Sequence, residues 1–188
     1  MLDVRSVKVN GRLEPTSFTV PNGDAILITG PNGAGKSTLL DCIAGILKPS
    51  SGDVTSESLA PPAYLPQNPP RPFAYTVGEY LMIGQKQQAG RDYTAKLDIE
   101  ALLDREITRL STGQWQRVAL TKVMQRDQSV IVLDEPDAPL DDHWSEQLAT
   151  VIDEEVARGK VIVMTLHRPE IRKSWKFQQI NLTHVAIS

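Results

Sequence analysis

The chain has 188 residues, of which 40% are hydrophobic, and a formal net charge of −3 from 20 Lys and Arg against 23 Asp and Glu. This length suits one domain with a real core, and the acidic balance argues against a nucleic-acid-binding protein. No apolar run approaches the ~18 residues of a membrane span, no signal peptide is evident at the N-terminus, and a single cysteine, Cys42, suits a reducing compartment. We therefore expect a cytoplasmic protein that reaches a membrane only through a partner.

The first third of the chain predicts strands followed by one helix. Residues 1–23 alternate apolar and polar side chains between turn residues, which is typical of antiparallel hairpin strands. Residues 25–29 form an apolar run and predict a buried strand, and the residues after the glycine loop predict a helix that ends near Leu47, before Pro49. Six prolines between residues 61 and 72 predict an extended, semi-rigid connector.

The rest of the chain predicts a helical insert and then alternating strands and helices. Helices are expected over 77–83, 97–110 and 114–124; buried strands over 130–133 and 161–165; a helix over 142–156; and one or two short strands in the remainder. Alternation of buried strands with helices predicts an α/β fold with a mostly parallel sheet. We expect a single domain, 1–188, with a core of 1–72 and 129–188 and a helical insert at about 73–128.

A glycine-rich loop lies between the predicted strand 25–29 and the helix that follows it. It fits the phosphate-binding pattern G-x-x-x-x-G-K-[ST] at every fixed position, and its residues are Gly30, Pro31, Asn32, Gly33, Ala34, Gly35, Lys36, Ser37 and Thr38. The glycines allow backbone N–H groups to converge on an anion, Lys36 supplies charge for the β and γ phosphates, and the Ser37 hydroxyl suits Mg²⁺. A chance match in a chain of this length is roughly a one-in-a-hundred event. The pattern predicts triphosphate binding.

Four polar residues after predicted strands and in the connector are candidates for hydrolysis. Asp134 follows the strand 130–133 and is expected to hold Mg²⁺ through a water, while Glu135 is expected to polarise the attacking water as general base. Gln67 in the connector has an amide suited to Mg²⁺ or the attacking water, and His167 could bond the γ-phosphate. The alternatives are a solvated acidic pair, an ordinary connector residue and a polar strand cap.

A second turn of small residues opens the predicted helix 114–124. Its residues Ser111, Thr112, Gly113 and Gln114 predict a second anion site at a helix N-terminus, unless Ser111 is only a helix cap. One nucleotide does not need two such sites from one chain. Two chains packed head to tail would use both, with each ATP between the Lys36 loop of one chain and the Ser111 turn of the other.

Together these motifs resemble the ATP-binding subunits of ABC transporters. Gly30–Thr38 is similar to the Walker A loop, Gln67 to the Q-loop glutamine, Leu110–Gln114 to the signature motif, Val130–Pro136 to Walker B, Ala138–Asp141 to the D-loop and His167 to the switch histidine. The resemblance implies a P-loop NTPase fold of the ABC ATPase type and ATP hydrolysis with Mg²⁺. It also implies a head-to-tail homodimer, or a pair with a related subunit, that docks on integral-membrane subunits at the inner face of the cell membrane. The docking surface is expected near Gln67 and over 73–84.

This chain departs from the family pattern at a few positions. Thr112 replaces the usual glycine of the signature, Pro139 is unusual in the D-loop, and no aromatic residue near Val7–Gly11 is evident for stacking on adenine, so base selectivity stays open. The runs 76–81 and 115–118 resemble ATPases of cobalamin and metal-chelate importers, while Thr112 and the short C-terminal end are similar to haem-export ATPases. The alternatives to a transport ATPase are a soluble ABC ATPase in cofactor assembly or translation and a scaffold that does not hydrolyse nucleotide.

Overall fold

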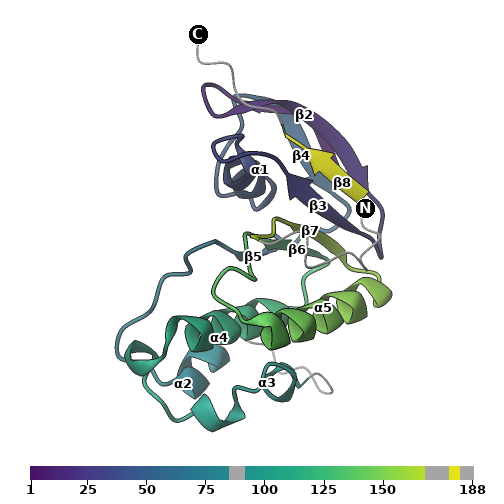
Figure 1. The fold of residues 1–188 in the computed structure, drawn as a ribbon. Coiled ribbons are helices and arrows are strands. Elements are labelled where there is room, and N and C mark those ends of the chain that lie inside the picture. The colour runs from purple at the N-terminus through teal and green to yellow at the C-terminus, as the bar shows by residue number, and fades with distance from the viewer. Residues whose placement is uncertain (85–91, 168–177, 183–188) are drawn as a thin grey trace.

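The computed structural model describes residues 1–84, 92–167 and 178–182, and two sheets organise them (Figure 1). The first is antiparallel, with the order β2 (Leu13–Val20), β1 (Leu2–Val9), β4 (Ser51–Ser56). The second is parallel throughout, with the order β5 (Ala63–Leu65), β6 (Val130–Leu133), β7 (Val161–Met164), β3 (Ala25–Thr29), β8 (Gln178–Asn181). The prediction of an α/β fold with a parallel core and antiparallel N-terminal strands is confirmed.

The helices lie mainly on one side of the parallel sheet. Their bounds are α1 (Lys36–Ile43), α2 (Val77–Met82), α3 (Tyr93–Lys96), α4 (Thr112–Met124) and α5 (Asp142–Ala157), with 3₁₀ turns at Glu100–Leu102 and Ile107–Arg109. Figure 1 shows α2, α3, α4 and α5 below β5, β6 and β7, while α1 and the antiparallel sheet lie above. None of the helices in the described ranges is both long enough and apolar enough to cross a bilayer.

The apolar core is divided into two halves by the parallel sheet. Because successive side chains of a strand point to opposite faces, Ile131 and Leu133 pack with α2–α5, whereas Val130 and Val132 pack with α1 and the antiparallel sheet. The strands β3 and β7 alternate in the same way. All four residues of β6 and of β7 are buried, which explains why these segments read as continuous apolar runs.

Three sequence predictions need correction. The single helix expected over 97–110 is wrong: Asp98 adopts a left-handed φ of 44°, and the segment continues as the two 3₁₀ turns, which bury Leu102 and Ile107 against the helical side of the core. The helix after the glycine loop ends at Ile43 and not near Leu47, because Gly45 takes a φ of 75° and terminates it. The connector also contains the short strand β5, which pairs with β6.

A buried cluster of charges joins α5 to α3 and to the start of β7. Glu155 is fully buried; it accepts a hydrogen bond of 2.5 Å from the Tyr93 hydroxyl, lies 2.9 Å from Lys160 Nζ and pairs with Arg158. Burial alone would raise the pKa of Glu155, but the hydrogen bonds from Tyr93 and Lys160, with the charges of Lys160 and Arg158, lower this pKa below the ordinary 4.5. The carboxylate therefore stays ionised inside the fold.

Candidate nucleotide and catalytic site

The glycine loop connects β3 to the N-terminus of α1, as the sequence predicted. Gly35 directly precedes α1 with a φ of 91°, and a Cβ on this residue would lie only 2.3 Å from the carbonyl oxygen of Arg12. A glycine is therefore required here by both the backbone conformation and the close approach of the β1–β2 turn. The Lys36 ammonium, which has three donors, bonds the carbonyl oxygens of Gly30 at 2.9 Å and Pro31 at 3.1 Å. It leaves one donor for an anion above the loop.

Asp134 and Glu135 lie at the carboxyl end of β6, next to the end of β7. The Thr165 hydroxyl donates a 2.6 Å hydrogen bond to Asp134 Oδ1. The Oγ1 atom of Thr165 also accepts a 2.8 Å hydrogen bond from the Glu135 backbone N–H. Asp134 is only 3% exposed, and Glu135 has a left-handed φ of 46°. A glutamate in this conformation is strained, so Thr165 holds the turn in place. Sequence analysis treated Thr165 only as the end of a strand and missed this role.

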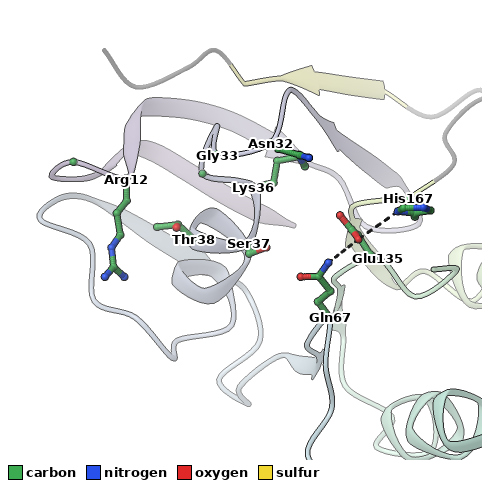
Figure 2. A pocket seen from close by; sticks show the side chains of 11 residues that line it. Arg12, Asn32, Gly33, Lys36, Ser37, Thr38, Gln67, Glu135 and His167 are labelled. Atoms are coloured by element: carbon green, nitrogen blue, oxygen red, sulfur yellow. Dashed lines mark hydrogen bonds and ion pairs between the residues drawn. The ribbon is translucent and has the colours of Figure 1, made fainter. Parts of the chain in front are cut away.

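The side chains of Gln67 and His167, the other two candidates, both lie next to the Glu135 carboxylate. Its Oε2 accepts a 2.8 Å hydrogen bond from Gln67 Nε2 and lies 3.8 Å from Nδ1 of His167 (Figure 2). The backbone N–H of His167 donates to Asp137 Oδ1 at 2.9 Å. Three residues from three different segments, predicted separately, are therefore brought together at one edge of the sheet.

A cavity of about 580 Å³ joins the glycine loop to this carboxylate. It is lined by Gly11, Arg12, Asn32, Gly33, Gly35, Lys36, Ser37, Thr38, Gln67, Glu135 and His167. Gly11 and Arg12 were not among the predicted site residues. The sequence prediction for this turn concerned only an aromatic residue near Val7–Gly11, and a charged residue just after it was not considered.

The oxygen donors predicted for a metal lie at different depths. The Ser37 hydroxyl and the Gln67 amide line the cavity, whereas Asp134 is buried beside Thr165. Since Gln67 gives its NH₂ group to Glu135, its amide oxygen is available to a ligand. Among the described ranges no group of three or more His, Cys, Asp or Glu side chains is arranged to hold a metal ion. These donors would suit an ion that takes its other ligands from phosphate oxygens.

The second predicted turn does not line this cavity. Ser111 is the N-cap of α4: its side chain accepts a 3.2 Å hydrogen bond from the Gln114 N–H, and Gln114 Oε1 accepts one of 3.1 Å from the Ser111 N–H. The helix-cap alternative is therefore present in the structure. Thr112 lines a separate cavity of about 380 Å³, together with Gln67 and Pro139.

Two hydrogen bonds join the start of α4 and the residues before it to the proline-rich segment that follows Gln67. The Trp115 indole donates to the Pro69 carbonyl at 3.0 Å, and Arg71 donates to the Leu110 carbonyl at 2.9 Å. The centroid of the Trp115 ring also lies 5.4 Å from the ring centroid of Tyr80 on α2. The segment that carries Gln67 is thus fastened to the helix that begins at the second turn.

Comparisons with known proteins agree with these features. The family model described as ABC transporter matches residues 13–138. The chain is 35% identical over 175 residues to the cytochrome c biogenesis ATP-binding export protein CcmA of Gluconobacter oxydans, covering 90% of this chain and 82% of that protein. It is 32% identical over 197 residues to the vitamin B12 import ATP-binding protein BtuD of Vibrio vulnificus, covering 88% and 78%. A bacterial ABC transporter cassette solved as a dimer shares the fold, with a TM-score of 0.84 at 21% identity and coverage of 97% and 94%.

The fold, the glycine loop and the carboxylate at the end of β6 define a P-loop ATPase cassette. The chain belongs to the ABC transporter family, as an ATP-binding subunit that hydrolyses ATP.

Proposed function

We propose that the 580 Å³ cavity binds Mg²⁺-ATP, with the triphosphate on Gly30–Thr38 and with Glu135 as the general base for the attacking water. The observation that carries the proposal is that the Lys36 loop and the Glu135 carboxylate line one cavity although they are about a hundred residues apart in sequence. Lys36 and the N-terminal end of α1 offset the charge of the β and γ phosphates. Gln67 and His167, which flank Glu135, orient the water and contact the γ-phosphate.

The residues fit a magnesium ion held partly by the nucleotide. Mg²⁺ keeps several waters and takes few protein ligands beside the phosphates. The Ser37 hydroxyl and the Gln67 amide oxygen would be direct ligands, and the buried Asp134 carboxylate would act through a water. The ion would supply charge neutralisation between the β and γ phosphates.

A second subunit is proposed to complete each site. The turn Ser111–Gln114 lies outside the cavity of its own chain, and the first N–H groups of α4 form an anion-binding helix end. Packed head to tail, two chains would present this turn to the γ-phosphate bound by the other chain. We propose a homodimer, or a pair with a related subunit, in which each chain is one domain with residues 73–128 as its helical insert.

The partner in transport is proposed to dock on the proline-rich segment and α2. Phe73 is 81% exposed and Met82 is 75% exposed, with Tyr75 and Ile83 also exposed nearby in sequence. Such a group of exposed apolar side chains is typical of a binding surface. We propose that it receives integral-membrane subunits, which would place the protein at the inner face of the cell membrane, with no role in nucleic-acid binding.

The Glu135→Gln variant tests the catalytic proposal. It retains the acceptor for Gln67 but removes the base, so we expect nucleotide binding to persist while the turnover rate falls by at least ~100-fold. With Mg²⁺-ATP this variant should become a dimer in light scattering, whereas Lys36→Ala should stay monomeric and bind nucleotide weakly. Robust hydrolysis by Glu135→Gln would refute the role of Glu135, and a monomer at saturating ATP would refute the dimer.

The docking proposal has a separate test. Phe73→Asp should move the protein from the membrane fraction of its native cells to the supernatant. Leu59→Asp is the matched control, because Leu59 is fully exposed but lies outside the proposed surface. Equal release by both variants would contradict a specific docking surface.

A further inference from the structure

Arg12 lines one end of the 580 Å³ cavity, and none of the roles proposed above involves this residue. It belongs to the β1–β2 turn, where its N–H bonds the Val9 carbonyl at 2.9 Å, and its side chain is exposed and lines the cavity. Within residues 1–84, 92–167 and 178–182, its guanidinium takes part in no ion pair or hydrogen bond. A charged side chain is therefore available to a ligand at this position.

The position of Arg12 relative to the glycine loop is fixed by packing. The Arg12 carbonyl oxygen lies so close to Gly35 that a Cβ there would approach it to 2.3 Å, and the next residue, Leu13, is buried. The turn is thus held against the N-terminus of α1.

The direction of the bound nucleotide follows from the two ends of the cavity. Figure 2 shows Glu135 and His167 at one end, Arg12 at the other, and Lys36, Ser37 and Thr38 between them. If the γ-phosphate faces Glu135 and the β and γ phosphates lie at Lys36, the sugar and base must extend toward Arg12. This step rests on the proposed function.

The chemistry at the Arg12 end suits the flat face of a base. Among the residues that the structure describes, no Phe, Tyr or Trp lines the cavity. A guanidinium is planar and delocalised and stacks on aromatic rings, and stacking accepts different bases because each has a π face. We propose that Arg12 stacks on the base of the bound nucleotide, so that the site accepts purine nucleoside triphosphates by ring shape and does not discriminate ATP from GTP.

Calorimetry with three ligands tests this proposal: the non-hydrolysable AMP-PNP and GMP-PNP, and inorganic tripolyphosphate, which has no base. Base stacking is worth enough that Arg12→Ala should weaken AMP-PNP about tenfold and leave tripolyphosphate nearly unchanged. Arg12→Lys keeps the charge but should behave like Arg12→Ala, whereas Arg12→Tyr should restore AMP-PNP affinity. Arg5→Ala is the control, since Arg5 lies on β1, the strand that leads into this turn, has a side chain that is 74% exposed and does not line the cavity.

Two results would overturn the stacking role. If Arg12→Ala weakened tripolyphosphate as much as AMP-PNP and Arg12→Lys restored both, Arg12 would contact phosphate. If the wild-type protein preferred GMP-PNP by more than about tenfold and Arg12→Ala lost that preference, Arg12 would hydrogen-bond the O6 and N7 edge of guanine instead. Wild-type protein that bound none of the three ligands would refute the proposed function itself. Similar affinities for AMP-PNP and GMP-PNP, both lowered by Arg12→Ala, support the proposal.

Discussion

Replacing Thr165 by valine is expected to impair both folding and hydrolysis, because one buried hydroxyl holds two site residues. Valine has nearly the same shape but lacks the oxygen that donates to Asp134 at 2.6 Å and accepts the Glu135 N–H at 2.8 Å. Thr165 is fully buried, so no solvent replaces these bonds. Without the hydroxyl, the Asp134 carboxylate loses a hydrogen-bond donor. Glu135, whose backbone has a strained left-handed conformation, loses the acceptor of its N–H.

The magnitude follows from the two bonds. A hydrogen bond to a charged group contributes about 1.5–3 kcal/mol and a neutral one about 1 kcal/mol, so Thr165→Val should lower the free energy of unfolding by roughly 2–4 kcal/mol. For a domain of this size that corresponds to a decrease in Tm of roughly 4–15 °C. Thr165→Ser retains the hydroxyl and should cost about 1 kcal/mol or less, from one lost methyl group.

Urea unfolding and steady-state ATPase assays measure the two consequences. Below the unfolding transition, Thr165→Val should show a lower kcat than Thr165→Ser, since it would displace Glu135, the proposed base, while the KM for ATP changes little. Equal stability of the valine and serine variants would show that the hydroxyl does not hold the turn.

Three further predictions concern packing and the buried charges. Glu155→Gln removes one carboxylate partner of the buried Lys160, which still pairs with Asp127 at 3.1 Å, and should lower the free energy of unfolding by up to about 3–5 kcal/mol at neutral pH. The pKa of Glu155 is below 4.5 in the folded protein, so its stabilisation is present above about pH 4.5 and is lost as the pH falls through the lowered value. The variant should therefore show a flatter stability profile in acid. Gly35→Ala should lower Tm more than Gly45→Ala, since both have a left-handed φ but only Gly35 meets a neighbouring backbone atom. Trp115→Phe keeps an aromatic ring but loses the indole donor and part of the buried ring volume, so it should destabilise by at least about 1 kcal/mol and speed hydrogen exchange in 67–73.

The sequence predicted the parts of the fold whose local pattern is not contradicted by tertiary contacts. The glycine loop between a strand and a helix, the buried runs that became β6 and β7, and the helix 142–156 all follow from periodicity and from the special conformations of glycine. The residues of 97–110 also carry apolar side chains at helical spacing, but Asp98 turns the chain and the core is filled by two short turns instead. The strand β5 escaped prediction because its three residues lie between prolines.

The candidate site was predictable where a residue type has one natural use beside a phosphate. Lys36, Ser37 and Glu135 were predicted in this way, and all three line one cavity in the structure. Thr165 was not predictable, because its value lies in two hydrogen bonds made across strands and not in its own chemistry. Arg12 was passed over because an exposed arginine after a turn is an ordinary surface residue until the glycine loop is seen beside it.

The strand order indicates which candidate site residue is held least firmly by the core. Glu135 and Thr165 follow the central strands β6 and β7, so they cannot move without disturbing the buried core. Gln67 follows β5, a strand of three residues at the edge of the described sheet, where it pairs with β6. In the segment after Gln67, the Pro69 carbonyl accepts a hydrogen bond from Trp115 of α4, whose ring packs against Tyr80 of α2. We therefore expect a displacement of α2 or of the start of α4 to reach the proposed base through the 2.8 Å hydrogen bond between Gln67 and Glu135. The proposed base thus follows a central strand, whereas the amide that bonds it follows an edge strand.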